Sequence, residues 1–200
     1  MGIHIKSNPS VPSLLLNAGA GVYNIGVPGW SEVPFDLFEA PIRNRPNGVR
    51  GSIEQMPFQL ATFDAVVCVG EVLDYCDPQK AIHEFARVLK PRGIVVCDFG
   101  STKSFRRWFN TGYGRAADLV TEQYNGSPEL VWVYDPAYIL SLLKSAGFRI
   151  QEIYGTHTWS AIAVKLGIGE ERAIEIQRRL DWLPTPSVCA DVVTIAAVRI

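Results

Sequence analysis

The stretch FDAVVCVGEVLDYCDPQKAIHEFARVLKPRGIVVCDFG, residues 63–100, carries the strongest structural signal in this chain. It contains two apolar runs, Ala65–Val69 and Ile94–Phe99, and between them apolar residues recur at helical spacing. Asp77 can cap this helix, and Pro78 fits its first position because the missing N–H has no intrahelical partner there. Both runs are apolar on successive residues, as in strands buried on both faces. The stretch therefore predicts a parallel strand–helix–strand unit.

The end of the predicted helix is marked by Lys90 and Pro91. Proline disfavours α geometry in the residue before it, so the helix should close there. Gly93 then supplies the conformational freedom for a turn into the second strand.

The overall composition indicates one globular domain covering residues 1–200. The chain is 48% hydrophobic and 20% charged, with a formal net charge of −1. Such a balance argues against a nucleic-acid partner, because phosphate binding needs a concentrated positive field. The sequence has no apolar run of membrane-spanning length, and its N-terminal apolar segment is too short for a secretory signal. We therefore expect a cytoplasmic protein without a membrane partner.

Cysteine and histidine usage gives no sign of a metal centre. The four cysteines form no C-x-x-C pair or zinc pattern, and only three histidines are present. Cys68 and Cys97 fall inside the two apolar runs and are expected to be small core residues with free thiols. We expect neither a bound metal nor a disulfide.

Upstream of the central unit, the apolar run Leu14–Ala18 leads into the turn Gly19-Ala20-Gly21, which is typical of the opening of a nucleotide-binding α/β sheet. The next strand, predicted at Glu32–Phe35, follows after only about fourteen residues, too few for a full crossover helix. The turn reads G-A-G-V-Y-N and lacks the third glycine of a dinucleotide-binding fingerprint, so NAD is disfavoured.

The string F-D-A-V-V-C, followed by D-P-x-K-A-I-x-E-F-x-R-V-L-K-P-x-G, resembles the central block of the class I S-adenosylmethionine-dependent methyltransferases. This resemblance implies a Rossmann-like, seven-stranded, mostly parallel sheet with an antiparallel last strand and helices on both faces. The first crossover would be shortened in this chain. S-adenosylmethionine is the implied cofactor.

The resemblance also implies which residues hold the cofactor. A carboxylate at Asp36, at the end of the second strand, can accept hydrogen bonds from both ribose hydroxyls. Two positions depart from the family: Asn17 stands where many relatives have an acid for the methionine ammonium, and Ser52 stands where relatives have an acid near the adenine amino group. The implied cofactor-binding residues are Asn17, Ala18, Gly19, Ala20, Gly21, Asp36, Ser52, Ile53 and Gly70.

Glu71, Tyr75 and His157 are the candidates for a catalytic base. Glu71 and Tyr75 follow the fourth strand, whose carboxyl end faces the ligand crevice of such sheets. Relatives often carry Glu-His where this chain has Asp74-Tyr75, so the most obvious base is missing. A sulfonium methyl is already electrophilic, and transfer chiefly needs a nucleophile held in line with the sulfur in a site without water.

The second half of the chain continues the same resemblance. A last crossover helix is expected from Asp135, a sixth strand at Phe148–Tyr154 and an antiparallel seventh at Val192–Val198. Charge and spacing predict an additional exposed helix over residues 167–183.

Residues 101–133 occupy the place where this family often carries a lid over the acceptor. Aromatic residues alternate there with Arg106, Arg107 and Arg115, which suggests an anionic or sugar-like acceptor. The alternative is a small inserted subdomain whose aromatics fill its own core.

These observations favour an S-adenosylmethionine-dependent methyltransferase acting on a small-molecule acceptor, with O-, N- and C-methylation left open. The substitutions at Asn17, Ser52 and Asp74-Tyr75 motivate a second hypothesis, a non-catalytic S-adenosylmethionine-binding protein or partner subunit with the same fold. A nicotinamide-dependent oxidoreductase is a distant third.

Overall fold

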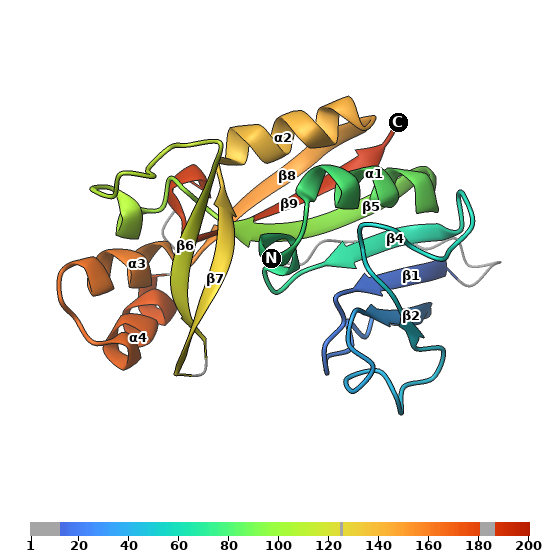
Figure 1. Cartoon of the computed structure of the whole chain (residues 1–200), viewed down its shortest axis with the longest axis horizontal. Helices are drawn as coiled ribbons and strands as arrows, with labels where there is room; N and C mark the ends of the chain where they lie inside the picture. The colour runs from blue at the N-terminus through green and yellow to red at the C-terminus, as the bar shows by residue number, and fades with distance from the viewer. Residues whose placement is uncertain (1–12, 125, 181–186) are drawn as a thin grey trace.

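The computed structural model describes residues 13–124, 126–180 and 187–200. Its centre is a seven-stranded sheet in the order β3-β2-β1-β4-β5-β9-β8 (Figure 1). The strands of this sheet are β1 (Ser13–Ala18), β2 (Trp30–Asp36), β3 (Val49–Arg50), β4 (Phe63–Cys68), β5 (Leu89–Gly100), β8 (Phe148–Thr156) and β9 (Val192–Arg199). The helices are α1 (Pro78–Val88), α2 (Pro136–Ser145), α3 (Thr158–Lys165) and α4 (Glu170–Leu180), with 3₁₀ turns η1 (Val72–Tyr75), η2 (Phe105–Arg107) and η3 (Ser187–Cys189).

The pairing within the sheet confirms the expected topology. Strands β3, β2, β1, β4 and β5 pair in parallel, and β9 runs antiparallel between β5 and β8. The chain leaves β1 toward β2 on one side and returns to β4 on the other. Ligands of open α/β sheets bind at such a switch point, outside the carboxyl ends of the strands.

Helix α1 begins as predicted. The Asp77 carboxylate accepts hydrogen bonds from the amides of Gln79 at 2.9 Å and Lys80 at 3.4 Å, and Pro78 opens the helix. The expectation for its end was wrong, because β5 starts directly at Leu89. The left-handed backbone lies at Arg92, with φ 66°.

Gly93 is required for space and not for its conformation. A Cβ atom at this position would lie 2.9 Å from both Leu89 Cδ2 and the Lys90 carbonyl oxygen. Approaches this close need a residue without a side chain.

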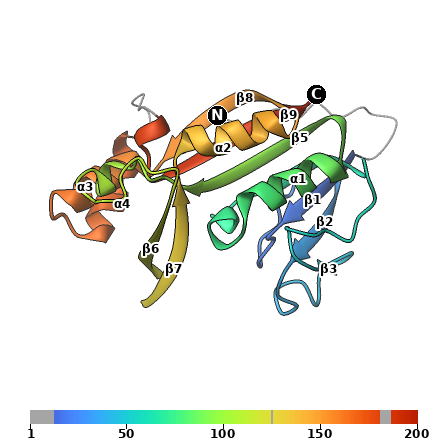
Figure 2. The ribbon, with the colours of Figure 1, turned by 45° about the horizontal axis from the view of Figure 1, so that its top comes forward.

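The two faces of the sheet are covered differently. Helices α1 and α2 both pack on one face, burying Phe85 and Ile139 in the main core (Figure 2). Within the described residues, the opposite face is covered by the segment after β1, where Ile25, Val27 and Trp30 contact a smaller apolar cluster. This detail differs from the expected helices on both faces. The physical reason is the short first crossover, which contains no helix.

Two insertions lie at one end of the sheet. Residues 101–133 form η2 and most of a hairpin, β6 (Ala117–Tyr124) and β7 (Ser127–Tyr134), which packs against η1. Helices α3 and α4 lie between β8 and β9 in the chain; α4 occupies the region of the predicted extra helix, whose residues 181–183 lie outside the described part. Neither α3 nor the hairpin was predicted. No helix in the described ranges is long and apolar enough to cross a membrane.

Candidate active site

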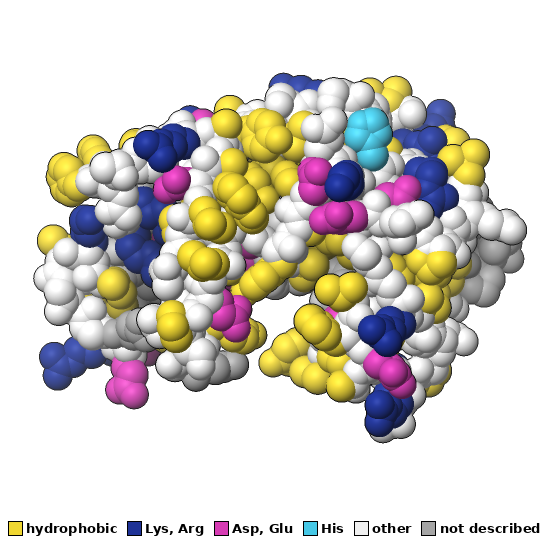
Figure 3. Space-filling model, in the orientation of Figure 1, with side chains coloured by type: hydrophobic (Ala, Val, Ile, Leu, Met, Phe, Trp, Pro, Cys, Tyr) yellow, Lys and Arg dark blue, Asp and Glu magenta, His cyan; other side chains and the backbone are white. Residues whose placement is uncertain are grey.

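Two adjoining cavities open at the carboxyl ends of the parallel strands. The larger has a volume of about 610 Å³ and lies over β1, β2 and β3, and the smaller, of about 230 Å³, lies between η1, the hairpin and α3. They share a wall of Gly70, Tyr75, Tyr124 and Glu129. The molecular surface is hollowed here, between the hairpin and the β1–β2 side of the sheet (Figure 3).

The larger cavity unites five of the nine residues implied for the cofactor. They come from the ends of four strands and so converge only through the parallel sheet. Apolar side chains that the sequence did not single out complete the walls. The residues lining the larger cavity include Gly19, Asp36, Ser52, Ile53 and Gly70 from the prediction, and Leu37, Phe38 and Val72 besides.

Asp36 is the one carboxylate at the end of β2, and it is 7% exposed. It accepts hydrogen bonds from the amides of Gly21 at 2.8 Å and Phe38 at 2.9 Å, one on each oxygen. A carboxylate offers about four acceptor positions, so each oxygen keeps a free lone pair. The side chain is therefore oriented by the backbone and can still accept from two hydroxyl groups.

Gly19 brings the loop after β1 close to η1. Its φ is 76°, and a Cβ atom there would lie 2.4 Å from Val72 Cγ2. Any other residue would be strained and would displace Val72 from the cavity wall. The glycine turn therefore packs closely against Val72 in the wall of the larger cavity.

Asn17 lies elsewhere than the family pattern implied. Its amide nitrogen donates to the Tyr23 carbonyl at 3.0 Å and to Glu32 Oε1 at 2.8 Å. Glu32 in turn accepts from the amide of Ile25 at 3.0 Å and pairs with Arg45 at 3.0 Å. Asn17 therefore anchors the loop between β1 and β2. The described residues that line the larger cavity do not include Asn17, Ala18, Ala20 or Gly21.

The smaller cavity brings together all three candidate bases. Glu71 and Tyr75 come from the turn after β4, and His157 caps the start of α3 with φ 61°. Further charged groups reach this cavity from η1, from the 101–133 segment and from the residue before β9. No local signal in the sequence pointed to Glu122, Glu129 or Asp191. The ionisable groups lining the smaller cavity besides the candidate bases are Asp74, Arg106, Arg107, Glu122, Glu129 and Asp191.

The turn that presents Glu71 is held by Asp98, a residue that sequence reasoning missed. Gly70 and Glu71 both have left-handed backbones, with φ 91° and 60°. The Asp98 carboxylate accepts from their amides at 3.1 Å and 2.7 Å. Burial first, and then the nearby Asp98 charge, raise the pKa of Glu71 above its ordinary value. In the described part of the chain, no hydrogen bond or ion pair engages the Glu71 carboxylate.

Tyr75 is a hydrogen-bond donor in the wall between the cavities. Its hydroxyl donates to Glu129 Oε2 at 2.9 Å, which joins η1 to the hairpin. Burial, and then this hydrogen bond, raise the pKa of Tyr75 to about 12. The hydrogen bond fixes the Tyr75 hydroxyl in the wall between the two cavities.

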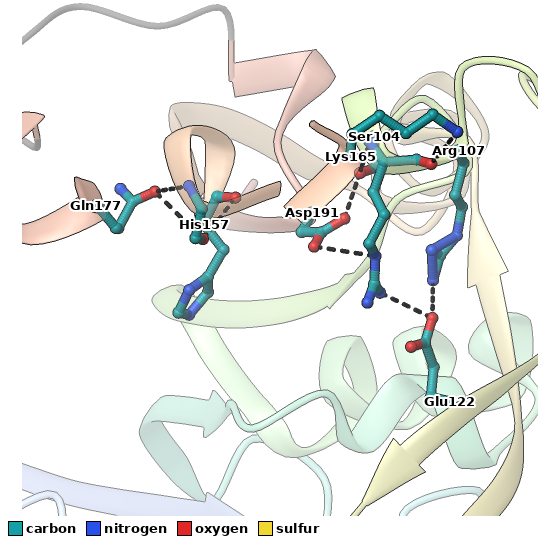
Figure 4. A network of polar contacts seen from close by, with 9 residues as sticks. Ser104, Arg107, Glu122, His157, Lys165, Gln177 and Asp191 are labelled. Atoms are coloured by element: carbon teal, nitrogen blue, oxygen red, sulfur yellow. Dashed lines mark hydrogen bonds and ion pairs between the residues drawn. The ribbon is translucent and has the colours of Figure 1, made fainter. Parts of the chain in front are cut away.

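The arginines of the 101–133 segment are already paired with acids (Figure 4). Arg106 contacts Glu122 at 2.9 Å and Asp191 at 3.3 Å, and Arg107 also pairs with Glu122. Arg115 pairs with Asp118 of the hairpin at 3.4 Å. The guanidinium groups that line the smaller cavity thus have their charges matched within the protein.

His157 presents its imidazole away from the start of α3 (Figure 4). The free amides there are satisfied by Gln177 of α4, whose Oε1 accepts from Trp159 at 2.8 Å and Ser160 at 3.0 Å. The ring of His157 is therefore not used as a helix cap, and the residue lines the smaller cavity.

We expect Asp74→Asn to stabilise the fold increasingly with pH. Asp74 is 3% exposed and accepts from the Gly100 amide, and burial, followed by the Glu71 charge, raises its pKa from 3.8 to about 8. Between these values the unfolded chain releases a proton that the folded chain retains, so this group costs stability as pH rises through that window. Urea unfolding at pH values from about 4 to about 8 should show a growing difference between variant and parent. The control Asp118→Asn should show no such growth, and a pH-independent difference for Asp74→Asn would contradict the prediction.

Part of the chain resembles known methyltransferases in sequence. The family model described as "Methyltransferase domain" matches residues 31–97. A demethylmenaquinone methyltransferase of Deinococcus radiodurans is 29% identical over 110 residues, 50% of this chain and 46% of that protein. The chain therefore spans about half the length of this curated relative in the match.

Solved structures cover nearly the whole chain. A SAM-dependent methyltransferase from Methanosarcina mazei matches with a TM-score of 0.61 at 17% identity, over 94% of this chain and 93% of that one. Residues 31–97 therefore match a methyltransferase domain, and the chain as a whole has the fold of S-adenosylmethionine-dependent methyltransferases.

The methyltransferase fold does not by itself decide the reaction. The [4+2]-cyclase SpnF matches with a TM-score of 0.59 at 16% identity, over 94% of this chain and 74% of that one. The function of this chain must therefore be argued from its own cavities.

Proposed function

We propose that this chain is an S-adenosylmethionine-dependent methyltransferase that acts on a small-molecule acceptor. The observation that carries the proposal is the pair of adjoining cavities, in which an oriented Asp36 lies in one and Glu71 in the other. A cofactor site and an acceptor site must share a boundary for a methyl group to pass between them. Gly70 and Tyr75 form part of that boundary.

The residues of the larger cavity fit the cofactor. Asp36 would accept from the ribose hydroxyls, and Leu37, Phe38 and Ile53 would contact the adenine. When bound, S-adenosylmethionine supplies a methyl group on a positive sulfur, and the electron pair of the broken C–S bond stays on that sulfur. Gly19 lets the loop backbone approach the ligand without a side chain in between.

Glu71 is the residue we assign to the acceptor's proton. It is exposed to the smaller cavity, it is held in position by Asp98, and its raised pKa makes it a stronger base than an ordinary carboxylate. Tyr75 would position Glu129 in the shared wall. His157, on the opposite side, is the second candidate for the proton.

The size and walls of the smaller cavity favour a small acceptor. Its volume of about 230 Å³ suits a metabolite, and the hairpin contributes Tyr124 and Glu129 to both cavities. We propose that residues 101–133 act as a lid over the acceptor. An anionic acceptor would have to displace carboxylates from Arg106 or Arg107, whereas an acceptor with hydroxyl or ammonium donors, including a sugar-like one, matches the free carboxylates.

Calorimetric titration tests the cofactor assignment directly. We expect S-adenosylmethionine and S-adenosylhomocysteine to bind and NAD to give no heat. Formation of S-adenosylhomocysteine over a panel of small metabolites then tests for turnover. Binding without turnover on any acceptor would support the alternative, a non-catalytic binding protein, and failure of the two sulfur compounds to bind would refute both.

A further inference from the structure

The smaller cavity contains more acidic than basic groups. Five carboxyl groups line it, from η1, the hairpin and the residue before β9, against two guanidinium groups from η2. In order along the chain, the carboxyl groups are those of Glu71, Asp74, Glu122, Glu129 and Asp191. The bare count predicts a cavity that attracts cations.

The ion pairs show which acids are neutralised, because the arginines pair with only two of them. Arg106 and Arg107 are matched by Glu122 and Asp191. Asp74 accepts only from a backbone amide, at 3.1 Å and 3.0 Å on its two oxygens. Glu129 accepts from the neutral hydroxyl of Tyr75, and Glu71 has no partner among the described residues. Three carboxyl groups in the cavity therefore lack a positive partner.

Two of these three groups are repelled by neighbouring acids. Burial comes first, and then neighbouring acids raise the pKa of Glu71 and of Asp74, the latter to about 8. A positive group entering the cavity would relieve this repulsion. A metal ion is not the natural occupant, since in the described ranges no three His, Cys, Asp or Glu side chains are grouped to hold one.

The position of the unmatched acids indicates where the positive group would lie. Glu71 follows Gly70 directly, and Glu129 belongs to the wall that both cavities share. The charge thus gathers on the side of the cavity that faces the larger one. Other parts of the lining are apolar, with Val131, Val133 and Val192. This arrangement suits a molecule with an apolar body and one cationic end.

We infer that the acceptor is a small primary or secondary amine, which binds as an ammonium ion with its nitrogen against Glu71 and Glu129 at the boundary of the two cavities. The inference rests on the proposed function, because it names the substrate class of the same site. Glu71 takes one N–H proton, and the nitrogen keeps the electron pair of that bond. This freed lone pair is the nucleophile that methyl transfer requires.

Binding of matched probes tests the inference without any turnover. Phenethylamine, 2-phenylethanol and phenylacetate share one ring and differ in the charge of the terminal group. With the larger cavity saturated by S-adenosylhomocysteine at neutral pH, we expect phenethylamine to bind at least about tenfold more tightly than 2-phenylethanol, the scale of a hydrogen bond to a charged group. Phenylacetate should bind most weakly. Saturation-transfer NMR and calorimetry measure all three.

Two variants localise the effect. Glu71→Gln and Glu129→Gln should each weaken phenethylamine about tenfold and leave 2-phenylethanol unchanged, because only the charge is removed. Glu71→Gln should keep its affinity for S-adenosylhomocysteine. Glu175→Gln is the matched control, since this acid pairs with Arg179 on the exposed side of α4, outside both cavities.

The outcomes separate the two proposals. If phenylacetate or 2-phenylethanol binds as tightly as phenethylamine, or if none of the three binds, the amine acceptor is refuted while S-adenosylhomocysteine binding keeps the methyltransferase proposal standing. An ammonium preference that survives Glu71→Gln and Glu129→Gln refutes the assigned position. Loss of S-adenosylhomocysteine binding in the parent chain refutes the proposed function itself.

Discussion

Replacing Asp36 with alanine is expected to weaken S-adenosylhomocysteine binding by about 1.5–3 kcal/mol, roughly 10- to 150-fold in Kd, the range for hydrogen bonds to a charged group. The carboxylate is buried at the end of β2 and oriented by the amides of Gly21 and Phe38. The carboxylate also lines the larger cavity, where it would accept hydrogen bonds from the two ribose hydroxyls. Calorimetric titration of parent and variant measures the loss.

The variant also loses two hydrogen bonds to the backbone, so a control must separate binding from loop damage. Asp64→Ala provides it: this carboxylate accepts from the Leu14 amide at 2.9 Å and pairs with Lys90 at 2.9 Å, at the amino ends of the strands, away from both cavities. We expect Asp64→Ala to lower stability and leave ligand affinity within about twofold, since distant sites act independently. Equal affinity of Asp36→Ala and the parent would remove Asp36 from the site.

Replacing Glu71 with glutamine is expected to lower kcat by about 10²- to 10⁴-fold, the usual contribution of a positioned general base. Affinity for S-adenosylhomocysteine should not change, because Glu71 lines only the smaller cavity. The measurement is single-turnover methyl transfer to the amine or other acceptor found by the panel, together with a binding titration. Glu39→Gln, at an exposed ion pair with Arg43, is the control and should retain parental kcat.

The pH profile distinguishes a base from a residue that merely shapes the cavity. A base acts when deprotonated, so the rate should rise with pH through the pKa of Glu71. Burial and Asp98 place that pKa above the ordinary carboxyl range, and the rise should therefore occur at higher pH than for an exposed glutamate. In Glu71→Gln this limb should disappear. If the limb persists there and is lost in His157→Gln, the proton belongs to His157.

The cofactor half of the site could be predicted because each of its parts follows a strand. A parallel sheet brings the carboxyl ends of its strands to one edge, so Gly19, Asp36, Ser52 and Gly70 could be expected to meet once four strands were recognised. Asn17 shows the limit of this reasoning. Its side-chain amide donates a hydrogen bond to Glu32 across the loop, and the spacing of the two residues in the sequence does not reveal this contact.

The acceptor half could not be predicted in the same way. Glu122 and Glu129 pair with each other in a hairpin that packs against η1, a turn far away in the chain, and Asp191 precedes β9. The arginines could be identified in the sequence, but whether their positive charges are neutralised depends on these acids. An anionic acceptor was a reasonable expectation from Arg106 and Arg107 alone, and the ion pairs to Glu122 and Asp191 changed the sign of the free charge.

Residues 63–100 by themselves determined the strand–helix–strand unit, because capping, helical periodicity and continuous apolar runs are local properties of the chain. Together with the glycine turn and the acid after β2, they predicted the fold and the place that we propose for the cofactor. Only the tertiary structure decided which side chains line the smaller cavity. The electrostatic field in the smaller cavity is the sum of charges from five separate segments. Which of these charges pair depends on which side chains meet after folding, and not on their spacing along the sequence.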